Sequence, residues 1–391
     1  MLASGRYIPI GFVKMNSKER MLTALNHEQT DRVPMDLGGR QTTLMIPAYE
    51  RLKEYLGYSD MPTDVMSHRW QTAYVDEEIL KHFSIDTRHV RPRNKALKDP
   101  EKPYEENDLF YDNWGVGRII SGGYANISHH PLQKAESLEE IVKYEWPNPE
   151  EEFDYTGLRE HTEKLYHEGE FAIVGCMGSP GNTFEQAWYV RGLSEFLLDM
   201  VMKKEIAHAI MRKIVDHRKI NAELFLKEVG DFLDVIQVAD DLGAQNNSLM
   251  SPDLYREMIK PYQAELISHI KKFTKAKIYH HSCGSIANIL DDMIEIGIEI
   301  LNPVQATAVG METDKLKKRF GEKLIFWGAI DTFQVLPFGS VADVQKEVKK
   351  RITDLGFGGG YVLGSVHNMQ TDVPPENVEA MFQTAIAFKF D

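Results

Sequence analysis

The stretch Lys277–Gly284 (KIYHHSCG) combines a short apolar strand pattern with two imidazoles and a thiol at its end. Alternate residues of a strand point to opposite faces, so His281 and Cys283 are predicted to face one side and His280 the other. In a barrel of parallel strands, catalytic groups stand at such carboxyl ends. Imidazole and thiolate are ligands that zinc prefers. The pair therefore indicates half of a metal site, and a buried histidine beside an inert cysteine is the alternative.

Composition excludes several classes of protein. The 391 residues are 42% hydrophobic and 27% charged, which is typical of a globular protein with a large core. The net charge of -14 argues against nucleic acid or an anionic membrane as the main partner. Two cysteines make no disulfide framework and indicate a reducing compartment. We find no bilayer-spanning apolar run and no signal-peptide core, so a cytoplasmic protein is expected.

Short apolar runs alternate with helical patterns along most of the chain, as is typical of strands buried on both faces. The predicted strands are Val33–Asp36, Ile85–Val90, Phe171–Met177, Phe232–Ala239, Lys277–His281, Ile298–Pro303, Lys323–Ala329 and Gly360–Val366. This pattern predicts an α/β fold, a (β/α)8 TIM barrel formed by residues 19–391 as a single domain after an N-terminal extension of residues 1–18. A doubly wound open sheet is the alternative, but no G-x-G-x-x-G follows a strand.

Helices and one insertion complete the predicted architecture. Apolar residues at helical spacing predict helices over Ser194–Val229, Pro252–Lys272 and Val341–Leu355. The segment 108–132 is rich in glycine and aromatic residues and interrupts the alternation. We expect an inserted β-hairpin there, which covers one end of the barrel. Trp114 within it is a candidate for covering the substrate or for contacting a protein partner.

Polar residues follow the predicted strands, where a barrel places its active site. His367 follows the eighth strand, so it faces the same barrel mouth as His281 and Cys283. Three protein ligands with a fourth position open are typical of catalytic zinc. Asp240 and Asp241 are adjacent carboxylates that repel each other unless a cation or donor is near. Either is a candidate fourth ligand, or a residue that orients an imidazole.

Other strand-end residues are candidates for catalysis and substrate binding. Asp86 joins Asp240 and Asp241 as a candidate for proton handling. Arg40 and Arg88 are candidates for holding a substrate carboxylate through paired hydrogen bonds. Helix capping in an ordinary loop is the alternative role for such polar residues. The remaining substrate-binding candidates are Trp114, Asn302, Trp327 and Asn368.

From about Asn16 onward the chain resembles the uroporphyrinogen decarboxylase superfamily, and more closely its zinc-dependent corrinoid methyltransferase branch. The run His281–Gly284 resembles the His-x-Cys-Gly zinc element of those methyltransferases. The resemblance implies Zn²⁺, a small methylated substrate, a corrinoid carried by a separate partner protein, and a homodimer. We find no Asp-x-His-x-x-Gly corrinoid element in this sequence. The other matching segments are Arg32–Pro34, Ser251–Tyr255, Lys260–Tyr262, Trp327–Asp331, His367–Met369 and Pro374–Asn377.

Two departures from the family patterns direct the functional prediction. The true decarboxylases carry an Arg-Gln-Ala-Gly-Arg element, of which only Gly39-Arg40 is present, and they lack the His-x-Cys pair. Porphyrinogen decarboxylation is therefore disfavoured. The thiol-methylating branch has a second cysteine where this chain has His367. A zinc held by two imidazoles and one thiolate is a better Lewis acid, so we expect a methoxy substrate and O-demethylation.

Two further functions are consistent with the residues. One is a metal-independent decarboxylase or lyase that uses Asp86, Arg40 and His367, which predicts a protein without stoichiometric zinc. The other is an accessory protein that binds a corrinoid or tetrapyrrole, which predicts tight binding without turnover.

Overall fold

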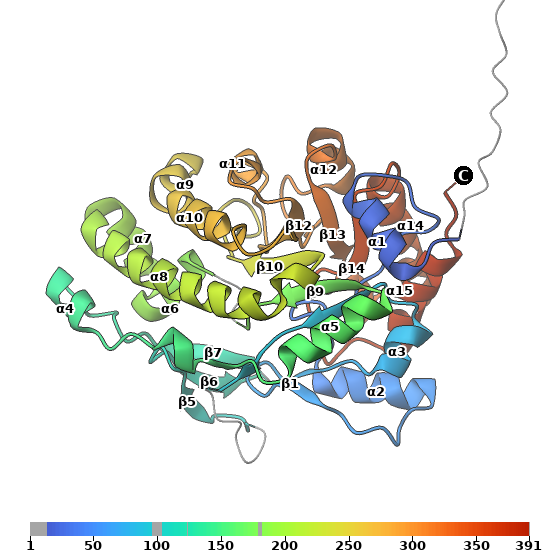
Figure 1. Cartoon of the computed structure of the whole chain (residues 1–391), viewed down its shortest axis with the longest axis horizontal. Helices are drawn as coiled ribbons and strands as arrows, with labels where there is room; N and C mark the ends of the chain where they lie inside the picture. The colour runs from blue at the N-terminus through green and yellow to red at the C-terminus, as the bar shows by residue number, and fades with distance from the viewer. Residues whose placement is uncertain (1–13, 96–103, 123, 179–181, 391) are drawn as a thin grey trace, which may run out of the picture.

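A curved parallel sheet surrounded by helices forms the centre of the molecule (Figure 1). The computed structural model describes residues 14–95, 104–122, 124–178 and 182–390. Residues 1–13 of the predicted extension therefore lie outside the described residues, and the first helix, α1 (Ser17–Leu25), begins within the extension. In spatial order the seven strands are β14 (Tyr361–Ser365), β13 (Ile325–Ile330), β12 (Ile300–Asn302), β11 (Lys277–His281), β10 (Val235–Ala239), β9 (Ala172–Cys176) and β3 (Thr87–Val90).

An extended segment around Met35 occupies the eighth position of the barrel. Met35 forms a parallel bridge with Leu363 of β14, and its carbonyl accepts a hydrogen bond from the backbone N–H of Asp86, 2.9 Å away. The segment thus joins the two edge strands, and the predicted TIM-barrel fold is confirmed. The strand predicted at Val33–Asp36 is corrected to a single bridge. Pro34 has no N–H to donate, which limits the ladder at this position.

Helices cover the outside of the sheet (Figure 1). Helix α1 (Ser17–Leu25) contacts the strands β3, β9 and β14. The helix predicted over Pro252–Lys272 is interrupted at Ile259. Pro261 has no N–H to donate to the preceding turn, so it starts a new helix instead of extending the first one. The helix predicted over Ser194–Val229 is interrupted at Lys203, where neither Gly nor Pro marks the break. The outer helices are α2 (Ile46–Leu56), α3 (Glu77–His82), α5 (Leu158–Glu168), α6 (Phe184–Arg191), α7 (Leu193–Met202), α8 (Lys204–Val229), α9 (Pro252–Met258), α10 (Lys260–Ile270), α11 (Leu290–Glu295), α12 (Thr313–Phe320), α13 (Val335–Phe338), α14 (Val341–Leu355) and α15 (Pro375–Ala387). Among the described residues, we find no helix that combines the length and low charge needed to cross a bilayer.

The predicted hairpin over 108–132 is an antiparallel sheet of three strands, β5 (Leu109–Tyr111), β6 (Gly117–Ser121) and β7 (Tyr124–His129). Trp114, between β5 and β6, anchors it: the indole is 3% exposed, and its ring lies 4.6 Å from that of His217 on α8. The remaining elements are β1 (Val65–Ser67), β2 (Thr72–Ala73), β4 (Arg93–Asn94), α4 (Leu138–Lys143), η1 (Pro149–Glu151), β8 (Phe153–Asp154) and η2 (Gly230–Phe232).

The barrel interior has an apolar base and a polar top. At the base, Met21 and Leu25 of α1 pack against inward-facing residues such as Tyr279 and Ile300. Because alternate residues of a strand face inward, His281 follows Tyr279 toward the carboxyl end. The parallel register sets His281 beside Asn302 of β12. The top of the barrel therefore presents polar groups where the base presents apolar ones.

Asp36 ties the closing segment to strands on both sides. Its carboxylate is 1% exposed and accepts hydrogen bonds from Thr42 Oγ1 at 2.7 Å, Thr87 Oγ1 at 2.5 Å, His89 Nε2 at 2.7 Å and Trp327 Nε1 at 3.0 Å. Burial alone would raise the pKa of Asp36, but His89 and the hydroxyl donors lower it below its ordinary value of 3.8. The ionised carboxylate therefore stabilises the closed barrel.

We expect Asp36→Asn to lower the free energy of unfolding at neutral pH by about 3 kcal/mol, because it removes a buried charge that four donors surround. The pKa of Asp36 is lower in the folded than in the unfolded protein. Its contribution to the free energy of unfolding is therefore fully present above pH 3.8 and is lost as the pH falls through the folded-state pKa. Urea unfolding across this pH range should show the difference from wild type shrinking toward acid. The exposed Asp60→Asn is the control, and a loss below about 0.5 kcal/mol in Asp36→Asn would contradict the account.

Candidate metal centre and its cavity

A cavity of about 480 Å³ opens at the carboxyl ends of the strands. It extends from the barrel to the inserted sheet, and its size suits a small-molecule ligand. Of the residues predicted for the site, the cavity is lined by Arg40, Trp114, Asp241, His281, His367 and Asn368.

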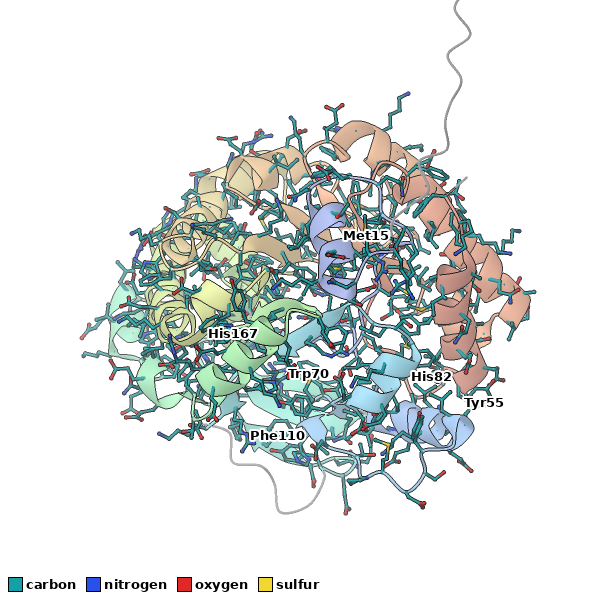
Figure 2. All side chains as sticks on the ribbon, turned by 45° about the vertical axis from the view of Figure 1, so that its right-hand side comes forward. Met15, Tyr55, Trp70, His82, Phe110 and His167 are labelled. Atoms are coloured by element: carbon teal, nitrogen blue, oxygen red, sulfur yellow. The ribbon has the colours of Figure 1, made fainter. Side chains whose placement is uncertain are left out.

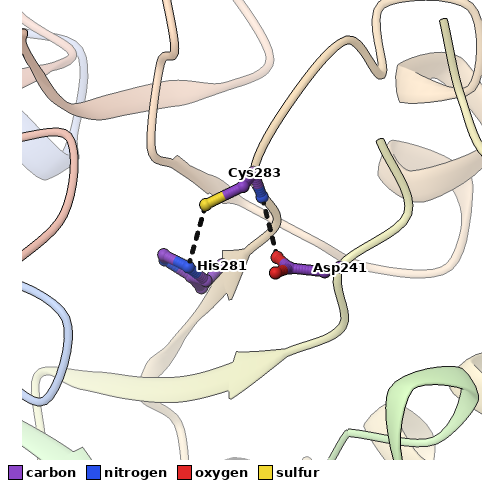
Figure 3. Close-up of side chains that lie close together, drawn as sticks. All are labelled: Asp241, His281 and Cys283. Atoms are coloured by element: carbon purple, nitrogen blue, oxygen red, sulfur yellow. Dashed lines mark hydrogen bonds between the residues drawn. The ribbon is translucent and has the colours of Figure 1, made fainter. Parts of the chain in front are cut away.

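Three ligand-type side chains meet where β10 and β11 end (Figure 3). One ligand atom from each of Asp241, His281 and Cys283 lies within 4.8 Å of the others. Cys283 Sγ is 3.5 Å from His281 Nε2, and the backbone N–H of Cys283 donates to Asp241 Oδ1 at 2.9 Å. A carboxylate, an imidazole and a thiol fit a divalent metal, and the thiol favours zinc over Mg²⁺ or Ca²⁺.

Close contact between two loops brings Asp241 to Cys283. A Cβ atom on Gly243 would lie 2.5 Å from the carbonyl oxygen of Cys283, and one on Gly284 would lie 2.6 Å from the backbone of Gly243. Gly284 also has φ +84°, which disfavours other residues. Glycine at both positions therefore allows the approach of the carboxylate to the thiol.

Asn302 of β12 orients the imidazole of His281. The Nδ2 of Asn302 donates to the carbonyl of Trp327 at 3.2 Å, so its Oδ1 is the acceptor that lies 2.6 Å from His281 Nδ1. His281 consequently carries its proton on Nδ1 and presents the Nε2 lone pair to Cys283. Asn302 and Trp327 are fully buried beneath the cavity rather than part of its lining, so they position groups instead of touching a ligand.

Asp240 points away from the cavity into the first turn of α6. Its carboxylate accepts hydrogen bonds from the backbone N–H groups of Phe184 at 2.9 Å and Glu185 at 2.7 Å, and from Gln263 Nε2 at 2.9 Å. These donors satisfy a buried carboxylate without a cation. Of the two adjacent carboxylates, Asp241 is the one beside His281 and Cys283.

Burial governs the protonation of the cluster in the absence of a cation. It lowers the pKa of His281 to about 4 and raises the pKa of the Cys283 thiol well above its usual range. Burial and the nearby charge of Glu185 raise the pKa of Asp241 to about 7. His281 is therefore a neutral ligand at pH 7, and a bound divalent cation would favour the thiolate of Cys283.

His367 lies beside the cluster but outside it. Its ring centroid is 5.6 Å from that of His281, in an edge-to-face arrangement. Burial lowers the pKa of His367 to about 3, so this imidazole is neutral as well. The structure thus brings two of the three predicted metal ligands, His281 and Cys283, together with Asp241, and leaves His367 facing the cavity next to them.

Two further predicted residues, Asp86 and Arg88, also lie away from the cavity. Asp86 precedes β3 at the opposite end of the barrel, where its buried carboxylate binds Arg20 Nη1 at 2.6 Å and Arg32 Nη1 at 2.8 Å. Arg88 lies between the inward-facing Thr87 and His89 and therefore faces outward. Its guanidinium pairs with Glu77 and lies 3.6 Å from the Phe171 ring centroid. Neither side chain can contact a ligand in the cavity.

The cavity also contains charged residues that the sequence reasoning missed. Arg91 directly follows β3, which is the strand-end position at which a cavity residue is expected. Arg69 follows β1 and Arg118 lies on β6 of the inserted sheet, so no barrel strand signals their place. Glu185, in the first turn of α6, accepts a hydrogen bond from Tyr189. These four charged residues and Tyr189 line the cavity together with Arg40.

Comparison with known proteins places the chain in a family. Residues 118–388 match the family model for uroporphyrinogen decarboxylase (URO-D). A uroporphyrinogen decarboxylase of Legionella pneumophila (strain Lens) is 21% identical over 377 residues, which cover 93% of this chain and 94% of the relative. One from Pectobacterium atrosepticum is 23% identical over 292 residues, which cover 71% and 76%.

A solved structure shares the fold over almost the whole length of both chains. A methyltransferase from Methanosarcina mazei superposes with a TM-score of 0.63 and 18% sequence identity, covering 95% of this chain and 99% of the other. The family model spans more than half of the sequence and includes β6 to α15. On this match the chain belongs to the uroporphyrinogen decarboxylase family.

Proposed function

We propose that this chain is a zinc-dependent methyltransferase that moves a methyl group between a small methoxy compound and a corrinoid protein. The observation that carries the proposal is the group of Asp241, His281 and Cys283 at the carboxyl ends of adjacent barrel strands. A thiol and an imidazole that converge beside a cavity suit metal chemistry better than acid–base chemistry alone. The fold shared with the Methanosarcina mazei methyltransferase supports this choice.

The chemistry of the metal ligands also favours one class of methyl donor. Asp241, His281 and Cys283 would hold the ion, and His367 is the adjacent candidate for a fourth ligand or for a substrate contact. When bound, Zn²⁺ would supply Lewis-acid polarisation of an ether oxygen and so make it a better leaving group. A set with one thiolate retains more of that acidity than a set with two. The single thiolate among these ligands therefore favours methoxy compounds over thiols as methyl donors.

The chain itself would orient the groups and limit water in the cavity. Asn302 holds His281 in one tautomer, so the ligand nitrogen is oriented before any ion binds. Trp114 and the inserted sheet form one wall of the cavity, which restricts solvent. The corrinoid is assigned to a separate protein because we find no corrinoid-binding element in this sequence.

Metal-independent decarboxylation is the second candidate function. It is favoured by the names of the curated relatives and by the arginines that line the cavity. Asp86 could not serve such a reaction, because Arg20 and Arg32 hold it at the other end of the barrel. The acid–base role would then fall to Asp241 or His367. This candidate predicts full activity in protein stripped of metal.

Elemental analysis of purified protein should find about one zinc per chain in wild type and none in Cys283→Ala. Cys176→Ala is the matched control, since Cys176 is the other free cysteine and lies outside the metal cluster. It should retain zinc. A folded wild-type protein that takes up no zinc after reconstitution would contradict the proposal and leave decarboxylation as the function to test.

Asn302→Leu should weaken zinc binding by about 10-fold to 100-fold, because it removes the acceptor that fixes the tautomer of His281. Asn302→Asp keeps an acceptor at the same place and should restore most of the affinity. Competition with a chromophoric chelator measures both values. Equal affinity in the Leu and Asp variants would refute a positioning role for Asn302.

Zinc-loaded wild type, supplied with reduced cobalamin under anaerobic conditions, should remove the methyl group from a methoxyarene and form methylcobalamin. Asp241→Ala should lower kcat/KM by about 10²-fold or more, because it removes one of three ligands. The visible spectrum of cobalamin reports the reaction. Efficient methyl transfer to or from a thiol, with none from methyl ethers, would exclude the proposed donor class.

A further inference from the structure

The cavity holds two arginines whose charge the protein does not balance. The Nη1 of Arg69 and the Nε of Arg118 each lie 3.6 Å from the same oxygen, Asp112 Oδ2, which is too far for a hydrogen bond. Arg118 is 1% exposed, yet its Nε and Nη2 have no hydrogen-bond partner among the described residues. The Nε of Arg69 is also buried, and no described residue forms a hydrogen bond with it. Buried guanidinium groups normally have their donors satisfied, so these indicate a missing acceptor.

The charged groups around Arg69 and Arg118 predict that the missing acceptor is an anion. Two guanidinium groups and one carboxylate leave a net charge of about +1 around Asp112. Two further charged groups act on these arginines, Glu185 on Arg118 and Arg40 on Arg69, and their opposite charges leave the net charge at about +1. Burial, together with the charge of Arg118, lowers the pKa of Arg69 to about 9, so the cavity as it stands disfavours this charge. A single monoanion would relieve the imbalance.

Aromatic faces surround the same part of the cavity. The ring centroid of Trp70 lies 4.9 Å from Arg69 Cζ and 5.8 Å from Arg118 Cζ. Phe110 on β5 stacks on Tyr104, with ring centroids 4.1 Å apart. Figure 2 shows Trp70 and Phe110 on the side of the molecule where the inserted sheet lies, and both line the cavity. Flat apolar faces beside an anion site suit an aromatic ring that carries the anion.

We propose that Arg69 and Arg118 form a carboxylate-binding subsite and that the ligand of this cavity is an aromatic acid. The planar fork of arginine matches the two oxygens of a carboxylate. Combined with the proposed function, on which this step rests, the subsite makes the substrate a methoxylated aromatic acid. Both arginines belong to elements outside the barrel strands, so the carboxylate binds beside the inserted sheet while the metal cluster stands at the ends of β10 and β11.

Isothermal titration calorimetry with 4-methoxybenzoate, 4-methoxybenzamide and 4-methoxyphenyl phosphate tests the subsite. Wild type should bind the benzoate at least about 10-fold more tightly than the neutral amide, as charge-assisted hydrogen bonds predict. This ratio should fall to near 1 in Arg118→Met and in Arg69→Met. Arg212→Met, which alters an exposed arginine of α8 paired with Glu265, should keep the wild-type ratio.

Arg69→Met keeps the test decisive if the more deeply buried Arg118→Met does not fold. Equal binding of acid and amide by wild type, or an unchanged ratio in Arg69→Met, would overturn the subsite. Tighter binding of the phosphate than of the benzoate would overturn the choice of a carboxylate.

Binding is measured without a corrinoid, so its outcome is separate from that of the proposed function. Acid selectivity without methyl transfer would leave the subsite standing and remove the methyltransferase. Equally fast demethylation of the acid and the amide by wild type would support the methyltransferase and overturn the carboxylate subsite.

Discussion

The buried carboxylate of Asp36 is the constraint on which the arrangement of the site depends. At the eighth position of the barrel, residues 34–36 form three backbone hydrogen bonds with Leu363 and Asp86, and side-chain hydrogen bonds to Asp36 reinforce this short closure. One of these bonds comes from the indole of Trp327, whose carbonyl accepts a hydrogen bond from Asn302. Asn302 in turn orients His281. Barrel closure and the orientation of a candidate metal ligand therefore belong to one connected network of buried polar groups.

Side-chain direction on a strand is a local property, and it is predictable where the strand and its end are both recognised. The period of two is enough to place His281 on the cavity side and His280 on the other, as the structure has them. The same rule, applied to β3, shows why Arg88 is outside the cavity: it lies one residue from the inward-facing Thr87. Asp86 stands at the start of that strand, whereas active sites form at the opposite end.

The rest of the site depends on contacts between segments that are distant in sequence. Whether Asp240 or Asp241 faces the cavity is decided by the helix that Asp240 caps and by the close approach of two loops at Gly243. The charge of the cavity likewise comes from Arg69 and Arg118, which belong to excursions from the barrel. A pattern within one strand carries no information on such contacts. The family model covers residues 118–388, which include Asp240, Gly243 and Arg118 but not Arg69.

X-ray absorption at the zinc edge of the zinc-loaded protein reports the atoms around the ion and therefore tests whether Asp241, His281 and Cys283 bind it. We expect one sulfur at about 2.3 Å with nitrogen and oxygen ligands at about 2.0 Å to 2.2 Å. A wild-type spectrum with only nitrogen and oxygen ligands, or with two sulfurs, would contradict a centre built on Asp241, His281 and Cys283.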